Sequence, residues 1–245
     1  KREEPIVQEL ANEYLTEQGI TILNDVTLNS VSNDGNKPVI TVNGQNYTFD
    51  AVLYATGRRP NTTNIGLENT DITTNERSSI IVNDTCESSV PGVYAVGDVN
   101  GGPQFTYISL DDFRIVFGAL TGNGNYTLKD RKNIPYTTFL TPPLARVGLT
   151  EQEASNKGYT VKTKELLVAT MPRAHVNDNL KGAFKIVVDA KNNLILGATL
   201  YAQSAEELIN LIKMAMDNNI PYTYFKNQIF THPTMAENLN DLCNF

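Results

Sequence analysis

Two short apolar runs that each end in a glycine constrain the fold of this chain most strongly. Residues 51–55 (AVLYA) lead into Thr56-Gly57, and residues 93–96 (VYAV) lead into Gly97-Asp98. A buried strand of an α/β sheet has this pattern when it delivers a loop at its C-terminal end. The two runs therefore predict short buried strands followed by loops that a ligand can approach, about forty residues apart.

The polar residues beside these glycines suit a ligand with phosphate, carboxylate or hydroxyl groups. A glycine lets the backbone come close to a ligand, and Arg58, next to Arg59, suits a phosphate or a carboxylate. The carboxylate of Asp98 can accept hydrogen bonds from ligand hydroxyls. A helix that begins near Phe105 or Thr106 would direct free N–H groups at an electron-rich ligand atom. Taken alone, each motif is equally compatible with a structural turn.

Apolar residues at helical spacing predict two helices in the first half of the chain. Residues 4–18 have the pattern of an amphipathic helix. Residues 105–122 carry a second apolar stripe, in which Ser109 and Asp112 fit an S-x-x-D cap and Gly122 fits the terminating position. The β-rich segment between the first helix and residue 50 is interrupted by NDGN and NG, which are typical of tight hairpin turns.

The second half of the chain has a different pattern of predicted strands and helices. The polar, Gly- and Asn-rich segment 122–135 precedes it and marks the main domain boundary. Strand-like runs then lie at 136–140, 144–149, 159–170 and 182–202, with a short helix opened by Thr150 and Glu153 and a longer one at 204–219. Strands followed by a covering helix are α+β order.

Composition narrows the range of partners and compartments. The chain has 245 residues, of which 40% are hydrophobic and 19% charged, as in a globular protein of two to three compact units. Its net charge is −7 and it has no Lys/Arg-rich run, so we expect no nucleic acid and no membrane partner. The opening residues lack a secretory signal and an initiator Met, so we expect a cytoplasmic protein and a chain that begins partway through a longer one. Cys86 and Cys243 form no CxxC or CxxxxC motif, which favours two isolated thiols and no metal site.

The stretch Thr231–Asn238 (THPTMAEN) holds one of the two histidines and allows two interpretations. An imidazole can take a proton from a thiol and return it near neutral pH, so His232 could be a base that Glu237 orients. Thr234 and Glu237 also match the T-x-x-E capping box, in which the glutamate serves a helix start. The local sequence favours the cap. The other histidine, His175, lies in a polar connection, and we expect it to be at the surface or locally hydrogen-bonded.

Taken together and in this order, the motifs resemble one family. The stretches ATGRRPNT, PGVYAVGDV, ARVGLTEQEA, GAFKIVVDAKNNLILGATL with SAEELI, and HPTMAE resemble the C-terminal half of the flavoprotein disulfide reductases, or pyridine nucleotide-disulfide oxidoreductases. This family includes glutathione reductase, lipoamide dehydrogenase and mercuric reductase, and the resemblance covers nearly the whole chain. The stretch QFTYISLDDFRIV is more similar to the branch linked to reactive-chlorine resistance, including hypothiocyanous acid reductases, than to glutathione reductase.

The resemblance implies a fold and a domain order. It implies an α/β fold with partial NAD(P)- and FAD-binding domains, followed by an α+β dimerisation domain. The implied limits are residues 1–60 for the end of the NAD(P) domain, 61–126 for the end of the FAD domain and 127–245 for the dimerisation domain. We therefore expect a homodimer that assembles through the C-terminal domain. In such an enzyme hydride passes from NAD(P)H to FAD, then to a cysteine pair and finally to an acceptor.

The resemblance also implies which residues bind the cofactors. Gly57 and Arg58 would lie near the nicotinamide cofactor. Gly97 and Asp98 would lie beside FAD, with the carboxylate on the ribityl or ribose hydroxyls. The helix start at Phe105, Thr106 and Tyr107 would face the isoalloxazine ring.

For catalysis, the resemblance reverses the local preference at the C-terminus. It implies that His232 is the acid/base residue and Glu237 its partner, acting across the dimer on the thiols of the other subunit. The family's CxxxxC motif and both GxGxxG fingerprints are absent from this sequence. We therefore expect that this chain alone binds no FAD and is inactive. The alternative is a non-catalytic dimerisation or binding module of the same fold. The acceptor stays open among a disulfide, a metal ion and an oxidised halogen or thiocyanate species, as does the choice between NADH and NADPH.

Overall fold

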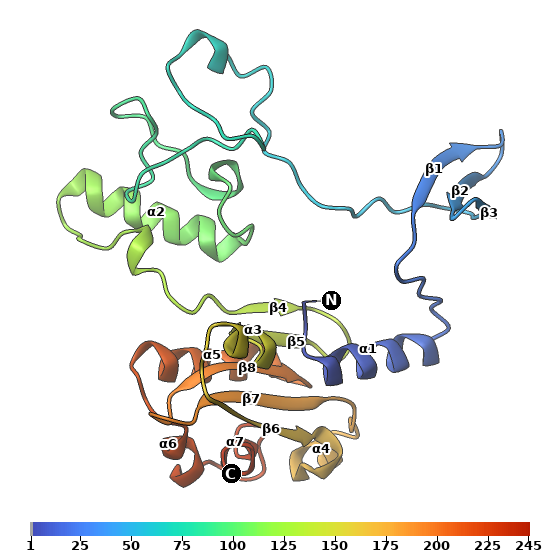
Figure 1. Cartoon of the computed structure of the whole chain (residues 1–245), viewed down its shortest axis with the longest axis vertical. Helices are drawn as coiled ribbons and strands as arrows, with labels where there is room; N and C mark the ends of the chain where they lie inside the picture. Colours follow the sequence, from blue (N-terminus) through green and yellow to red (C-terminus); the bar gives the residue numbers. More distant parts are fainter. Residues whose placement is uncertain (1) are drawn as a thin grey trace. The chain divides into compact units, whose positions relative to one another are not determined.

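The computed structural model of the protein describes residues 2–245, which fall into two compact units (Figure 1). The C-terminal unit combines the segment up to Leu23 with residues 132–245. The middle unit comprises residues 24–131. Helices and strands occur in both units, in agreement with the predicted α/β class.

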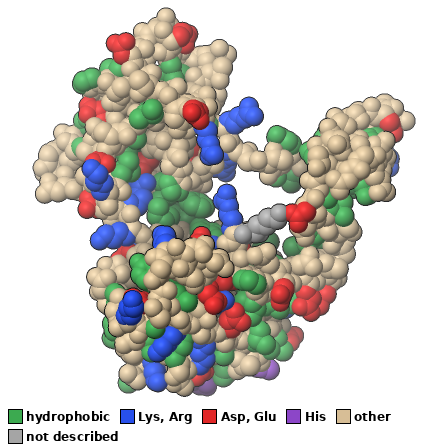
Figure 2. Space-filling model, viewed as in Figure 1, with side chains coloured by type: hydrophobic (Ala, Val, Ile, Leu, Met, Phe, Trp, Pro, Cys, Tyr) green, Lys and Arg blue, Asp and Glu red, His purple; other side chains and the backbone are tan. Residues whose placement is uncertain are grey.

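The surface carries charges of both signs. Figure 2 shows acidic and basic side chains interspersed over the face in view. Within residues 2–245, no helix combines the length and the apolar character that crossing a membrane requires.

A five-stranded antiparallel sheet forms the centre of the C-terminal unit. Its strands are β4 (Tyr136–Thr138), β5 (Leu144–Gly148), β6 (Val161–Leu167), β7 (Ala183–Asp189) and β8 (Ile195–Tyr201). Their spatial order is β4-β5-β8-β7-β6, and every neighbouring pair is antiparallel. Strand β7 lies between β6 and β8 in the sheet and is buried at every position. The strand-like runs predicted for this half are confirmed.

Helices cover this sheet as the α+β order predicts. They are α3 (Glu151–Asn156), α4 (Pro172–Val176), α5 (Ala205–Asp217), α6 (Tyr222–Asn227) and α7 (Asn238–Leu242), with a 3-10 turn η4 (Val168–Thr170). The buried residues of α5 recur three and four positions apart, so one face of the helix packs on β5 and β8. Thr150 and Glu153 form the predicted capping box at the start of α3.

Helix α1 (Pro5–Glu17) packs on the same sheet. Val7 is 1% exposed and contacts Leu144 and Tyr201. The hydroxyl of Tyr14 accepts a hydrogen bond of 3.0 Å from the backbone N–H of Gly182. The predicted amphipathic helix is thus confirmed, and its apolar face lies on the sheet of the C-terminal unit. The expected domain limits at residues 60 and 126 stay predictions.

The middle unit begins with a small antiparallel sheet. Strands β1 (Leu28–Asn33), β2 (Pro38–Val42) and β3 (Gln45–Thr48) follow one another in space as in sequence. Asn43 and Gly44, between β2 and β3, both have positive φ angles of 49° and 80°. Two consecutive positive φ angles are the requirement of a tight hairpin turn, so the predicted hairpin is confirmed there.

The two apolar runs that predicted buried strands do not form them. Residues 51–55 have no regular structure, and the side chains of Leu53 and Tyr54 are 90% and 79% exposed. In the second run Tyr94 makes only an isolated bridge to Glu87. A buried strand needs neighbouring strands to pair its backbone groups, and no described strand lies beside either run. This expectation was wrong, because an apolar run becomes a buried strand only where other strands and helices pack against it.

Helix α2 (Thr106–Thr121) follows in the middle unit, which also contains the 3-10 turns η1 (Leu67–Asn69), η2 (Gly97–Asn100) and η3 (Leu128–Asp130). The helix starts and ends as predicted, and Gly122 closes it in the left-handed conformation, with φ 67°. The predicted cap at Ser109 and Asp112 is wrong, since both residues lie inside the helix. The Asp112 carboxylate is instead fully buried.

Candidate functional site

His232 and Glu237 form a hydrogen-bonded pair in the C-terminal unit. Nδ1 of the imidazole lies 2.7 Å from Oε2 of the carboxylate. The histidine side chain is 67% exposed, whereas the glutamate side chain is 19% exposed. No described residue forms a hydrogen bond with Nε2. This nitrogen can therefore accept a proton from a group that approaches from the solvent side. The structure therefore brings the two residues together in the arrangement of an oriented base.

The same carboxylate also makes the reciprocal bonds of the T-x-x-E capping box, around the turn that precedes α7 and not at the N-cap of that helix, which is Glu237 itself. Its Oε1 accepts the backbone N–H of Thr234 at 3.1 Å, and the backbone N–H of Glu237 donates to the Thr234 hydroxyl at 3.2 Å. These two bonds close the turn directly before α7. The two interpretations of THPTMAEN are therefore compatible, because each carboxylate oxygen serves one of them.

The environment keeps Glu237 ionised. Partial burial opposes the charged form, but hydrogen bonds from His232 and from the Thr234 backbone outweigh it, so the pKa of the carboxyl lies below its usual value. An ionised carboxylate on Nδ1 fixes the tautomer in which Nδ1 carries the proton and Nε2 is the basic nitrogen. The pair can therefore accept a proton at Nε2 and support the resulting imidazolium.

The core holds this segment in place. Leu239 and Leu242 of α7 are fully buried, and Met235 is nearly so. The side-chain amide of Asn238 donates to the backbone oxygens of Thr234 and Met235 at 3.2 and 3.1 Å. The turn that carries the histidine thus rests on packed residues, while the imidazole itself faces outward.

The other expected site residues lie in the middle unit. Gly57 is exposed with φ 121°, and Arg58 follows it. The Arg58 guanidinium pairs with the Asp98 carboxylate, with 3.0 Å between Nη1 and Oδ2. Two of the predicted loops, forty residues apart in sequence, therefore meet through this ion pair.

Gly97 occupies a position where a larger residue would be strained. Its φ is 75°, and a Cβ atom there would lie 2.8 Å from the Ser109 hydroxyl oxygen. Its backbone N–H donates to Asp112 at 2.8 Å. The glycine at the end of the VYAV run is therefore required by close contact with α2, as well as by its backbone conformation.

Asp112 is a structural residue that sequence reasoning assigned to the wrong role. Its buried carboxylate accepts hydrogen bonds from the backbone of Gly97, from the side-chain amide of Asn100 at 2.9 Å and from Arg131 at 2.5 Å. Arg131 also donates to Asp111 at 2.8 Å. The partners lie up to nineteen residues away in sequence. The one sequence signal for this role is the position of an acidic residue on the apolar face of a helix.

Aromatic side chains gather where α2 begins. The rings of Phe105 and Tyr107 stack with centroids 5.1 Å apart and an angle of 9° between their planes. Burial raises the pKa of the Tyr107 hydroxyl above its usual value, so it stays protonated near neutral pH. Thr106, between them, is the first residue of the helix. The helix start thus offers aromatic surface together with the positive end of the helix dipole.

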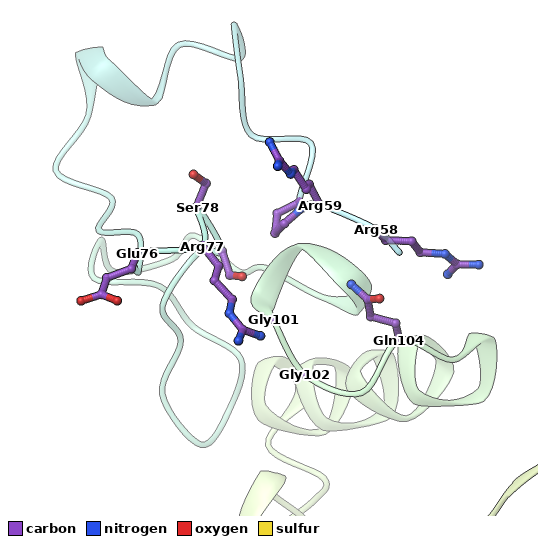
Figure 3. A pocket seen from close by; sticks show the side chains of 10 residues that line it. Arg58, Arg59, Glu76, Arg77, Ser78, Gly101, Gly102 and Gln104 are labelled. Carbon is purple, nitrogen blue, oxygen red and sulfur yellow. The ribbon is translucent and has the colours of Figure 1, made fainter. Parts of the chain in front are cut away.

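A cavity of about 680 Å³ adjoins the Arg58 loop. Arg58, Arg59 and Arg77 line it together with Gly101 and Gly102 (Figure 3). The sequence pointed to the first two arginines through the RR dipeptide. Arg77 was missed, because it lies in a loop that gives no motif.

Two family descriptions match the chain. Residues 1–112 match "Pyridine nucleotide-disulphide oxidoreductase" and residues 134–243 match its "dimerisation domain". A curated relative from Escherichia coli, "Probable pyridine nucleotide-disulfide oxidoreductase RclA", is 43% identical over 93% of the chain and 52% of its own length. Mercuric reductase of Staphylococcus aureus is 35% identical over 98% of the chain and 44% of its own length. The chain thus spans about half the length of the curated relatives it matches.

Solved structures give the same result. The "HOCl-induced flavoprotein disulfide reductase RclA" from Escherichia coli matches with a TM-score of 0.94 and 41% identity, over 99% of the chain and 56% of that structure. A Cu(II) complex of the same protein matches with a TM-score of 0.95 over 55% of its length. The resemblance inferred from the motifs and the predicted fold class are both confirmed.

Proposed function

Because the chain belongs to the pyridine nucleotide-disulphide oxidoreductase family, we propose that it is part of an FAD-dependent reductase. In this enzyme hydride passes from NAD(P)H to FAD, from FAD to a cysteine pair and from that pair to an acceptor. The observation that carries the proposal is the pair of His232 and Glu237, with its basic nitrogen exposed. The chain contributes this proton-transfer group and part of the cofactor sites.

His232 handles the protons in this proposal. Thiol–disulfide chemistry proceeds through the thiolate, so a thiol must lose its proton before attack and the leaving thiolate must regain one. Nε2 of His232 accepts the first proton, and the Glu237 carboxylate on Nδ1 stabilises the imidazolium that forms. The same imidazolium then returns the proton. The proposed homodimer, joined through the C-terminal unit, brings this histidine to the cysteine pair of the other subunit.

The residues of the middle unit fit a flavin dinucleotide. The Asp98 carboxylate, in the loop after Gly97, is 40% exposed, and only its Oδ2 is paired to Arg58. Asp98 would therefore hold ligand hydroxyls, while Phe105, Thr106 and the neighbouring Tyr107 would face the flavin ring. When bound, FAD accepts a hydride from the nicotinamide and passes two electrons to a disulfide. Gly57 and Arg58 would lie on the nicotinamide side.

The state of the two cysteines favours a second candidate function, that of a non-catalytic dimerisation module. Both cysteines of the chain are buried and unpaired, and burial raises the pKa of the Cys86 thiol to about 11 and of the Cys243 thiol to about 12. Neither thiol is therefore a nucleophile near neutral pH. The reductase proposal requires a cysteine pair from outside this sequence. The module proposal requires none.

The test uses the intact reading frame that contains this chain. We expect a yellow protein with a flavin spectrum, a CxxxxC motif upstream, and oxidation of NADH or NADPH in the presence of disulfide, metal-ion or oxidised-halogen acceptors. His232→Gln should lower turnover about 100-fold or more without releasing flavin, whereas His175→Gln should leave turnover unchanged. His175 is a matched control, because it hydrogen-bonds only the local backbone, at the Ala169 oxygen. A full-length protein without flavin and without the cysteine pair would establish the module instead. We also propose that the protein is cytoplasmic.

A further inference from the structure

Three asparagines of the chain, Asn43, Asn100 and Asn123, are each followed by a glycine. Asparagine is among the thermolabile residues. In an Asn-Gly dipeptide the glycine backbone nitrogen can attack the side-chain carbonyl carbon of the asparagine, because glycine has no side chain to obstruct the approach. The attack requires that the asparagine side chain and the glycine N–H group are both free to move. The local sequence makes the three sites similar, so their surroundings decide which of them reacts.

Asn100, in the turn η2, is held at both of its reacting groups. Its side-chain amide donates to the Asp112 carboxylate at 2.9 Å, and its side-chain oxygen accepts the backbone N–H of Gly102 at 3.0 Å. The attacking nitrogen would be that of Gly101, whose N–H donates to the Asp98 backbone oxygen at 3.2 Å. Attack would break these hydrogen bonds, so the structure protects Asn100.

Asn43, in the turn between β2 and β3, is also held. Its side-chain oxygen accepts the backbone N–H of Thr27 at 2.9 Å. The N–H of Gly44 donates to the side-chain oxygen of Asn29 in β1, again at 2.9 Å. The two groups that must meet are therefore each bonded to a neighbouring residue of the hairpin sheet, and this slows the reaction.

Asn123 has neither form of protection. It follows Gly122, which closes α2, and residues 123–127 have no regular structure. Asn123 and Gly124 are exposed, and within residues 2–245 neither the asparagine side chain nor the N–H of Gly124 forms a hydrogen bond. The backbone N–H of Asn123 donates to the Gly118 oxygen at 3.2 Å, on the side of the residue away from the reacting bond. Both reacting groups are thus free to approach each other.

We infer that Asn123 is a site of spontaneous deamidation. The backbone nitrogen of Gly124 bonds to Cγ of Asn123, the Cγ–Nδ2 bond breaks, and ammonia leaves with the amide proton. Water then opens the five-membered succinimide ring at either of its carbonyl carbons, which gives aspartate or isoaspartate. No oxidant, reductant or cofactor takes part. The inference therefore goes beyond the proposed function and does not depend on it.

The reaction places a new carboxylate directly after the C-terminal end of α2, where the helix dipole disfavours negative charge. In isoaspartate the backbone also runs through the former side chain and becomes longer. Gly124 packs closely on the helix, since a Cβ atom on Gly118 would lie 3.4 Å from the Gly124 Cα. A longer backbone displaces this contact. Deamidation is therefore expected to loosen the last turn of α2.

Peptide mapping by mass spectrometry, after incubation of this chain at neutral pH, tests the inference. We expect Asn43 to deamidate about tenfold more slowly than Asn123, because its hydrogen bonds must break first. Asn100 should be slower still. The matched control is the same chain unfolded in urea, in which the three rates should become similar. Similar rates in the folded chain, or faster reaction at Asn43 or Asn100 than at Asn123, would overturn the inference.

Asn29→Ala tests the physical basis of the selectivity. It removes the acceptor of the Gly44 N–H at an exposed position of β1. Deamidation of Asn43 should become several-fold faster, while the rate at Asn123 stays unchanged. Circular dichroism checks that the variant keeps its fold. A folded variant in which Asn43 reacts no faster than in the wild type would show that hydrogen bonding of the glycine nitrogen does not select the site.

Discussion

The buried carboxylate of Asp112 accepts a hydrogen bond of 2.8 Å from the backbone N–H of Gly97. This bond joins the middle of α2 to the loop that carries Asp98. Arg131 neutralises the carboxylate from the other side. The position of the proposed flavin-binding loop therefore depends on a residue that touches no ligand.

Asp112→Asn should destabilise the chain by about 2–4 kcal/mol, because it removes a buried charge that Arg131 and Gly97 both need. Urea denaturation measures the difference. Asp84→Asn is the control, since Asp84 pairs with Lys129 at the exposed surface, and there the free energy of unfolding should hardly change. Equal losses in the two variants would contradict the role assigned to Asp112.

Gly97→Ala should cost about 2–4 kcal/mol, from a strained positive φ and from contact with the Ser109 hydroxyl. Gly92→Ala isolates the first effect, because Gly92 has φ 78° and no atom within 4 Å of an added Cβ. It should cost about 1–2 kcal/mol. Adding Ser109→Ala to Gly97→Ala should recover part of the loss. No recovery would mean that the backbone alone requires the glycine.

Glu237→Gln should lower stability in a pH-dependent way. The pKa of Glu237 is depressed in the folded chain, so its contribution is present above the ordinary pKa of 4.5 and is lost as pH falls through the lower folded value. The difference in free energy of unfolding from the wild type should reach up to about 1 kcal/mol near pH 6, since the partner histidine is exposed. Thermal unfolding across this pH range measures it. A difference that is constant down to pH 2 would show that the carboxylate charge does not matter.

Lys185 holds α1 on the sheet. Its ammonium lies 3.1 Å from Glu4, 2.7 Å from Glu151 and 3.1 Å from Glu165. Both Lys185 and Glu4 are buried. Lys185→Met should therefore cost about 3–5 kcal/mol, because it leaves the Glu4 carboxylate buried and unpaired. Hydrogen exchange should show loss of protection in α1.

The control for this prediction is Lys162→Met, at an exposed position of β6, which should change stability by no more than about 0.5 kcal/mol. Burial alone would lower the pKa of Lys185, but the three carboxylates outweigh it and raise the pKa above the ordinary value of 10.5. The contribution of Lys185 is therefore complete at neutral pH and is lost only as pH rises through the folded pKa. Protection of α1 that survives Lys185→Met would show that apolar contacts suffice.

Local chemistry explains which elements could be predicted. Helix α2 ends at Gly122 because a glycine in the left-handed conformation follows an apolar stripe, and both signals lie in the same stretch of sequence. The Thr150 cap is equally local. The strand predicted at 51–55 failed because pairing depends on other strands. Asp112 was misassigned for a similar reason, since its partners come from two other segments.

The sequence identified most residues of the candidate site, but it did not predict all of their contacts. The His232 and Glu237 pair followed from the motif order, and local sequence could not separate it from the capping box because one carboxylate performs both tasks. Arg77 could not be found, since no sequence pattern places its loop beside Arg59. Tertiary contacts decide such positions.

The docking of α1 has a consequence for the order of events during synthesis. The ribosome completes α1 before any strand of its sheet exists, because residues 24–131 separate the two parts of the C-terminal unit. A helix of thirteen residues is marginal by itself in water. Val7 and Tyr14 therefore stay without their partners until β8 has emerged, and a chaperone that shields this apolar face would act in that interval.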